Sequence, residues 1–282
     1  MKIVYIGSDS SFSLIPFLSL VKSKHEVCAF AYDDVNSHFS TITSNSIQSV
    51  ALNYSVDLIN IDADYSNAIL KICSYQPDII IVSCYPRLLP SSLVSIAKEG
   101  CFNIHPSILP LYRGPIPLFW QFRDGVDNFG VTLHRMTNKF DDGNIVSQER
   151  VKIEDGVSHS KAMEQLAESS AKLVMRMLGN IEKGELTEKA QDNKHASYQT
   201  FPKKNDYRVS LSWTAKRIFN FVNAYKEKGR TFICKSEGRK YKLLEVYSYQ
   251  NTIYIDELNN ELENIVILSC NPGYIRCKIE AV

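Results

Sequence analysis

Short apolar runs alternate with segments of helical spacing through the first hundred residues of the chain. Each run is four or five residues long, which is the length of a buried strand rather than of a helix. The runs occupy residues 2–6, 27–31, 58–61, 79–82 and 101–104, and the helical segments occupy residues 12–22, 44–54, 65–75 and 91–99. Because strands that alternate with helices form parallel sheets, the pattern predicts an α/β fold. We expect an open, mostly parallel, twisted sheet with helices on both faces.

The pattern changes in the second half of the chain. Two more strands are expected at 130–136 and 143–153, and a long amphipathic helix at 158–183, where apolar residues recur every three or four positions until Gly184. The polar stretch that follows has no periodicity, and after it a short helix precedes four short apolar runs typical of strands. We expect an α/β domain over residues 1–184, a linker over residues 185–206 and a small C-terminal β-rich, OB-like domain over residues 207–282.

Asn103 and His105 are the first candidates for chemistry. They alternate with apolar neighbours at the end of the fifth expected strand, so their side chains point to the same face. Pro106 and Pro110 restrict the backbone immediately after them. An amide beside an imidazole, both on rigid backbone, is what a catalytic site requires.

Asp141 is the third candidate. It lies in an Asp-Asp-Gly turn, 36 positions after His105 and directly before the apolar start of a strand. Two adjacent strands would bring Asp141 beside His105. A metal site is not expected, because neither a second histidine at metal-binding spacing nor a cysteine cluster adds ligands to this pair. A purely structural histidine is the alternative to a catalytic one.

One long motif makes the chain similar to a known family. Residues 103–114 read N-x-H-P-S-x-L-P-x-Y-R-G, and residues 141–143 read D-x-G. Both resemble the folate-dependent formyltransferases, which include methionyl-tRNA formyltransferase, glycinamide ribonucleotide transformylase and the amino-sugar N-formyltransferases. Residues 7–12 resemble the family's first strand-to-helix turn, and residues 191–198 resemble the hinge of methionyl-tRNA formyltransferase. The resemblance covers most of the chain, strongly around the two motifs and weakly after residue 200.

The resemblance implies a formyltransferase-type, Rossmann-like fold and formyl transfer to an amine through a tetrahedral intermediate. It implies that Asn103 donates a side-chain hydrogen bond to the formyl oxygen, and that His105 stabilises the same oxygen and relays a proton. Asp141 would orient His105 and help to remove the amine proton, so that the two groups titrate together. Asp142 departs from the family pattern, and we expect it to be inert rather than to contact the amine.

By the same resemblance, 10-formyltetrahydrofolate is the expected formyl donor, and no metal is expected. Its pterin would lie against the backbone of the loop after the fourth strand and against the segment that follows His105. The residues expected to bind the donor, besides Asp141, are Cys84, Tyr85, Leu88, Ser107, Ile108, Leu109 and Pro110. A dinucleotide or P-loop site is not supported, because the chain lacks both G-x-G-x-x-G after Gly7 and G-x-x-x-x-G-K-[ST].

Composition and charge indicate where the protein is located and identify one basic region of the chain. The net charge of +1 over 282 residues hides an asymmetry, since residues 1–202 and 243–282 each carry −4 and residues 203–242 carry +9. The basic block suits an anionic partner or is a solvated surface. Seven scattered cysteines, no signal segment and no apolar run near the ~20 residues of a membrane span favour a cytoplasmic protein without a membrane partner.

Two acceptors and one non-catalytic function stay open. The first acceptor is a small amine, such as a nucleotide-linked amino sugar, and the second is methionyl-tRNA. By the resemblance, methionyl-tRNA formyltransferases carry a basic insertion after the second strand, whereas residues 33–44 contain no Lys or Arg, which favours the small acceptor. Tyr112 and Arg113 are candidates to contact the acceptor or to close the loop. A binding protein on the same fold is the third hypothesis, and a homodimer is left open.

Overall fold

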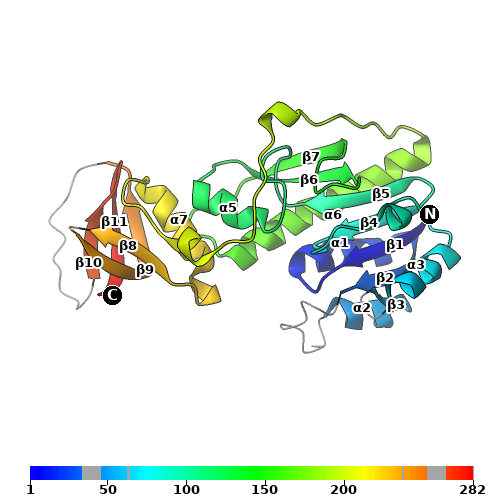
Figure 1. The fold of residues 1–282 in the computed structure, drawn as a ribbon, viewed down its shortest axis with the longest axis horizontal. Helices are drawn as coiled ribbons and strands as arrows, with labels where there is room; N and C mark the ends of the chain where they lie inside the picture. Colours follow the sequence, from blue (N-terminus) through cyan, green and yellow to red (C-terminus); the bar gives the residue numbers. More distant parts are fainter. Residues whose placement is uncertain (34–45, 62–63, 237, 253–264, 282) are drawn as a thin grey trace. The chain divides into compact units, whose positions relative to one another are not determined.

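The computed structural model describes residues 1–33, 46–61, 64–236, 238–252 and 265–281 (Figure 1). The chain forms two compact units that interleave along the sequence. The first contains Met1–Pro115, Asn128–Val151 and Met163–Tyr198, and the second contains Ile116–Asp127, Lys152–Ala162 and Gln199–Val282. Because the units interleave, the expected domain boundaries at residues 184 and 206 stay a prediction.

A seven-stranded sheet forms the centre of the first unit. Its strands are β1 (Lys2–Gly7), β2 (Glu26–Tyr32), β3 (Asp57–Asn60), β4 (Ile79–Ser83), β5 (Gly100–His105), β6 (Phe129–Arg135) and β7 (Ile145–Val151). They lie in the order β3-β2-β1-β4-β5-β6-β7, with β1 to β5 parallel and β6 antiparallel to both β5 and β7. The structure confirms the expected open, mostly parallel sheet.

Helices cover both faces of this sheet (Figure 1). They include α1 (Ser11–Val21), α2 (Ile47–Asn53), α3 (Tyr65–Ser74), the one-turn α4 (Ser91–Val94) and the long α6 (His159–Lys183). On one face, Phe17 of α1 packs on Tyr5 and Phe30, with ring centroids 5.4 and 5.6 Å apart. Ala68 and Ile72 of α3 belong to a buried cluster with the alternate residues of β1 and β2, which point to the opposite face.

Helix α4 is shorter than the helix expected at residues 91–99. It ends at Val94, and the Glu99 N–H then donates to the Asp78 carbonyl at 2.7 Å. The chain leaves the helix early because its backbone joins the segment before β4. Strand β5 follows directly and pairs with β4 from Gly100 onward, so that Asn103 lies within the sheet.

Antiparallel strands and the helices α5 (Pro117–Asp124) and α7 (Ala215–Tyr225) build the second unit. Its strands, β8 (Phe232–Ser236), β9 (Arg239–Gln250), β10 (Ile265–Ser269) and β11 (Tyr274–Ala281), lie in the order β10-β11-β9-β8. An aromatic core joins the helices, since Phe119 lies 5.4 Å from Phe221 and 5.3 Å from Tyr225 between ring centroids. The expected small β-rich domain is confirmed.

The cysteines and the helices also bear on the expectations about disulfides and membrane spans. All seven cysteines are described, and none of them forms a disulfide. Cys101, Cys234 and Cys277 are buried, and burial raises the pKa of each thiol. None of the helices in the described ranges combines the length and the apolarity that a membrane crossing needs.

Candidate active site

Strand β5 carries two of the expected site residues, Asn103 and His105. It lies between β4 and β6, and Asn103 is paired with His134 of β6 while His105 is paired with Thr132. The two residues are separated by one position, so both side chains project from the same face of the sheet. The His105 side chain is 5% exposed, which shields its imidazole from bulk water.

The turn after β6 brings the third expected residue to the other two. One carboxylate oxygen of Asp141, Oδ2, accepts a hydrogen bond from the Gly114 N–H at 2.8 Å. The other oxygen, Oδ1, accepts from Asn103 Nδ2 at 3.2 Å and lies 3.5 Å from His105 Nδ1. The structure therefore brings Asn103, His105 and Asp141 together, as the motif spacing predicts.

The backbone of this turn is unusual in two places. Asp141 has a φ of 52°, which is the left-handed conformation that few residues other than glycine adopt. At Gly143 an added Cβ would lie 1.9 Å from the Arg135 carbonyl oxygen, so that only glycine fits. The glycine of the Asp-x-Gly motif is thus required by close backbone contact, and the strained Asp141 needs surrounding contacts to hold it.

The neighbours of His105 decide which of its ring nitrogens is free to react. Nε2 lies 2.8 Å from the Tyr112 carbonyl oxygen, and because a carbonyl only accepts, Nε2 carries a hydrogen. Burial lowers the pKa of His105 below its usual value, and this outweighs the attraction of the Asp141 carboxylate. At neutral pH the imidazole is therefore uncharged, with the lone pair of Nδ1 on the side of Asp141.

Asp141 itself stays ionised. Burial alone would raise its pKa, but the positive charge that His105 gains at acid pH, the contacts of His134 and the Gly114 N–H hold the pKa of this carboxyl well below its usual range. A negative charge buried beside an uncharged imidazole favours a proton on that imidazole at the moment when one becomes available. The pair is arranged to take up a proton during a reaction.

His134 is a site residue that the sequence reasoning missed. Its Nε2 lies 3.1 Å from Asn103 Nδ2 and 3.4 Å from Asp141 Oδ1, and its Nδ1 lies 2.9 Å from the Arg135 carbonyl oxygen. The strand at 130–136 was expected, and a polar residue at its buried centre was the available signal. This signal identifies a site residue only together with the antiparallel register of β5 and β6, which places His134 opposite Asn103.

Side chains of β6 and β7 hold residues 107–109, the segment after His105, by hydrogen bonds. Thr132 Oγ1 donates to the Ser107 carbonyl at 2.7 Å and accepts from the Leu109 N–H at 3.0 Å. Gln148 Nε2 donates to the Leu109 carbonyl at 2.8 Å. Ser107 and Leu109 are buried, and the Ile108 side chain lies in the space that a Cβ at Gly130 would occupy. The expected folate wall is therefore rigid, and its contacts with folate stay a prediction.

The second expected wall is the loop after β4. Cys84 has a φ of 55°, Tyr85 is half-buried and packs against the core, and Leu88 is 41% exposed. Pro110 is joined to Leu109 by a cis peptide bond, and its carbonyl accepts from the Ser197 N–H at 3.2 Å. Of these residues, Leu88 exposes its apolar side chain, and the contact of this loop with a pterin stays a prediction.

Arg113 and Asp142 have structural contacts. Arg113 is 2% exposed, and its guanidinium donates to Gln191, Asn193 and Tyr198, which favours the loop-closing role over contact with an acceptor. The carboxylate of Asp142 accepts a short hydrogen bond from Thr137 Oγ1 and lies 4.0 Å from Lys139 Nζ. These contacts agree with the inert role expected for Asp142.

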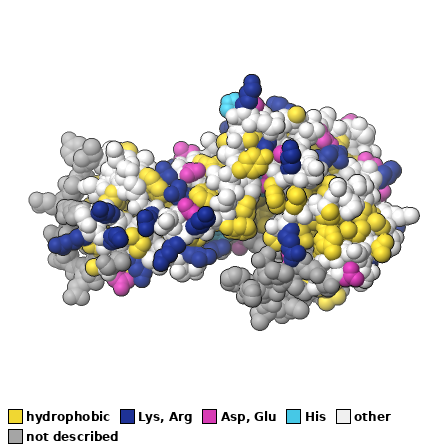
Figure 2. Space-filling model, in the orientation of Figure 1, with side chains coloured by type: hydrophobic (Ala, Val, Ile, Leu, Met, Phe, Trp, Pro, Cys, Tyr) yellow, Lys and Arg dark blue, Asp and Glu magenta, His cyan; other side chains and the backbone are white. Residues whose placement is uncertain are grey.

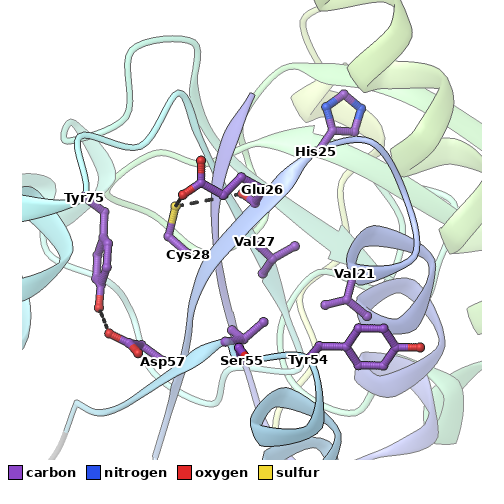
Figure 3. A pocket seen from close by; sticks show the side chains of 10 residues that line it. Val21, His25, Glu26, Val27, Cys28, Tyr54, Ser55, Asp57 and Tyr75 are labelled. Carbon is purple, nitrogen blue, oxygen red and sulfur yellow. Dashed lines mark hydrogen bonds between the residues drawn. The ribbon is translucent and has the colours of Figure 1, made fainter.

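Two further observations concern other kinds of site. Among the residues that the structure describes, no group of three or more His, Cys, Asp or Glu side chains is placed to hold a metal ion. A pocket of about 370 Å³ lies where β2 and β3 begin, and Figure 3 shows its lining. The lining residues are Val21, His25, Glu26, Val27, Cys28, Tyr54, Ser55, Val56, Asp57 and Tyr75, none of which belongs to the site around His105.

Comparison with known proteins gives the same assignment for sequence and fold. The formyl transferase family model matches residues 1–178. The methionyl-tRNA formyltransferase of Thermotoga neapolitana is 33% identical over 190 residues, 67% of this chain and 58% of that protein, and that of Syntrophomonas wolfei is 29% identical over 79% of this chain and 72% of that protein.

Solved structures match over the whole chain. The N-formyltransferase from Helicobacter canadensis, in complex with folinic acid and dTDP-3-aminofucose, is 18% identical, with a TM-score of 0.73 over 99% of this chain and 100% of that one. The sugar 3N-formyl transferase WlaRD gives a TM-score of 0.71 at 17% identity over 99% of this chain and 97% of that one. At these identities the likeness shows the fold alone.

Proposed function

We infer the reaction of this chain from its family. The chain belongs to the formyl transferases, which are enzymes that transfer a formyl group from a folate donor. We propose that the donor is 10-formyltetrahydrofolate and that the acceptor is the primary amine of a small, nucleotide-linked amino sugar. The observation that supports the catalytic roles is that Asn103 Nδ2 and His105 Nδ1 both lie within 3.5 Å of one carboxylate oxygen, Oδ1 of Asp141.

The proposed reaction begins with attack of the acceptor amine on the formyl carbon. A carbon–nitrogen bond forms, and the formyl oxygen becomes an oxyanion. Asn103 Nδ2 is the donor for this oxygen, and it directs its hydrogens to Asp141 and His134 in the structure. The formyl oxygen would therefore take one of these hydrogens as its negative charge develops.

Proton transfer completes the proposed reaction. The attacking amine loses a proton to Nδ1 of His105. This nitrogen is unprotonated because the ring hydrogen lies on Nε2, which donates it to the Tyr112 carbonyl. The Asp141 carboxylate stabilises the imidazolium that forms. The bond between the formyl carbon and the folate nitrogen then breaks, and that nitrogen receives the proton from His105.

Fold neighbours support the small acceptor, since a sugar 3N-formyl transferase and an N-formyltransferase bound to dTDP-3-aminofucose are matched over 97% and 100% of their chains. Length itself does not separate the two acceptors, because the methionyl-tRNA formyltransferase of Lachnospira eligens is matched over 90% of its own length. The absence of Lys and Arg from residues 33–44 also favours the small acceptor, although residues 34–45 lie outside the described residues. A segment without positive charge is a poor clamp for an RNA backbone.

Methionyl-tRNA is the second candidate acceptor. The sequence relatives described above have this activity, and residues 203–242 carry a net charge of +9. In the second unit, Lys235, Arg239 and Lys240 are exposed on the β8–β9 hairpin, and Figure 2 shows Lys and Arg side chains across the surface of this part. The cytoplasmic location and the homodimer stay predictions.

The acceptor is tested by measuring tetrahydrofolate release from 10-formyltetrahydrofolate. Charged methionyl-tRNA and a panel of nucleotide-linked amino sugars are offered separately, with uncharged tRNA and the unaminated sugars as controls. Turnover with an amino sugar supports the proposal, and turnover with charged tRNA alone replaces it with the second candidate. Folate binding without turnover of any offered acceptor would mean that the acceptor lies outside the panel or that the chain is a binding protein on the same fold.

A further inference from the structure

Gln191 connects the two chain segments that hold the catalytic side chains. Its Nε2 donates to the carbonyl oxygens of Asp141 and Gly143 at 2.8 and 2.7 Å. Its Oε1 accepts from Arg113 Nε at 3.1 Å and from Arg113 Nη2 at 2.7 Å. All the hydrogen-bonding positions of this amide are filled, which fixes both the place and the orientation of the side chain.

The donor half of Gln191 supports the Asp141 turn. Asp141 has the left-handed φ of 52°, a conformation that persists only where the surrounding structure holds it. Gln191 bonds the carbonyls on both sides of Asp142, so it holds the turn from its backbone rather than through a catalytic side chain. The position of the Asp141 carboxylate therefore depends on this amide.

The acceptor half of Gln191 supports the loop after β5. The buried Arg113 also donates to Tyr198 Oη at 2.7 Å and to Asn193 Oδ1 at 2.8 Å. The residues on either side of Arg113 serve the site directly, since the Tyr112 carbonyl accepts from His105 and the Gly114 N–H binds Asp141. Gln191 thus joins the backbone that orients His105 to the backbone that carries Asp141.

We propose that Gln191 is a positioning residue for formyl transfer, which sets the placement of Asp141 relative to His105 without contacting substrate. The proposal rests on the catalytic role proposed above for Asp141. Residues 185–206 were expected to be a linker, and a glutamine in a polar stretch carries no sequence signal for this role. A small displacement of a catalytic group lowers the rate of the chemical step far more than it weakens binding.

Two substitutions separate the halves of the amide. Gln191→Glu keeps an acceptor for Arg113 but removes the hydrogens given to the Asp141 and Gly143 carbonyls, whereas Gln191→Met removes both. We expect kcat to fall roughly 10- to 100-fold in Q191E and at least as far in Q191M, with the KM for folate changed less than about threefold. Asn193→Ala is the matched control, because it removes one acceptor of Arg113 and leaves the turn untouched, so it should keep most of the wild-type kcat.

A second readout does not require the acceptor to be known. The His105 imidazole is titrated by 15N NMR, since its midpoint reports on the Asp141 carboxylate and the second imidazole, His134, beside it. We expect the midpoint to move in Q191E and to stay in N193A. An unmoved midpoint together with wild-type kcat in Q191E would overturn the positioning role. If Asp141→Asn itself kept full turnover, the proposed catalytic role would fail instead, independently of Gln191.

Discussion

His134 Nε2 lies 3.1 Å from Asn103 Nδ2, and this contact orients the Asn103 amide. His134 Nδ1 faces the Arg135 carbonyl oxygen at 2.9 Å and therefore carries a hydrogen, while Nε2 faces the Asn103 amide nitrogen, which can only donate. The Asn103 NH2 group is thereby held toward His134 and the Asp141 carboxylate, with its own oxygen turned away from that negative charge.

We expect His134→Leu to lower turnover about 10- to 100-fold, because the Asn103 amide loses the acceptor that aligns it for the oxyanion. His134→Gln keeps an acceptor in reach and should recover part of the loss. Ser147→Ala on the neighbouring strand β7 is the control for general disturbance of this sheet edge, because it removes a buried hydroxyl that has no hydrogen-bond partner among the described residues. Equal activity of the Leu and Gln variants would show that the orientation of Asn103 does not depend on His134.

Asp141 and Asp142 make a matched pair of carboxylates in one turn. Asp141→Asn should reduce kcat roughly 100- to 10,000-fold with the fold retained, since it removes the charge that stabilises the His105 imidazolium. Asp142→Asn should change kcat little, because Asp142 is bonded to Thr137. Circular dichroism and thermal unfolding check the fold of both variants. The reverse order of severity would mean that Asp142 is the catalytic carboxylate.

The pH dependence follows from the lowered pKa of His105. The reactive form has this imidazole neutral, so kcat/KM should be level through neutrality and should fall only as pH drops through a pKa below the ordinary 6.5. Between that pKa and 6.5 the unfolded chain binds more protons at this residue than the folded one, so its contribution to the free energy of unfolding rises with pH across this window. A kcat/KM profile whose acid limb begins above pH 7 would contradict a neutral His105.

Thr132 is the buried support of the expected folate wall. Thr132→Val leaves the Leu109 N–H and the Ser107 carbonyl without their partner, which should lower the free energy of unfolding by about 1–3 kcal/mol. The KM for folate should rise more than kcat falls, because the Thr132 hydroxyl hydrogen-bonds with Ser107, Leu109 and Gln148 and so holds the expected folate wall rather than the His105 or Asp141 side chain. Thr132→Ser keeps the hydroxyl and should recover both values, measured by denaturant unfolding and steady-state kinetics. An unchanged KM in Thr132→Val would place the folate elsewhere.

The sequence predicted the sheet and the meeting of Asn103, His105 and Asp141 because their signals are local. Short apolar runs identify strands, and the alternation around Asn103 shows that it shares a face with His105. His134 and Gln191 could not be found in this way, since each acts through a partner distant in sequence. The role of His134 depends on the antiparallel register of β6, and that of Gln191 on side-chain contacts 50 and 78 positions away.

The basic hairpin of the second unit separates the two acceptor hypotheses. Lys235, Arg239 and Lys240 are exposed on β8 and β9, so their replacement by Gln should leave the fold intact. If the acceptor is methionyl-tRNA, removing each positive charge that pairs with a phosphate should weaken binding and reduce the slope of log K against log salt by roughly 1.

If the acceptor is a nucleotide-linked amino sugar, the triple Gln variant should keep wild-type turnover, because a ligand with one diphosphate needs only a few positive charges close to the reacting amine. Lys152→Gln, an exposed lysine outside the basic block, is the control for unspecific loss of charge. Binding of labelled tRNA over a salt series, together with sugar turnover, gives both readouts on the same preparations. Unchanged tRNA binding in the triple variant would assign these charges to a solvated surface, and a loss of sugar turnover would give the hairpin a role in binding the small acceptor.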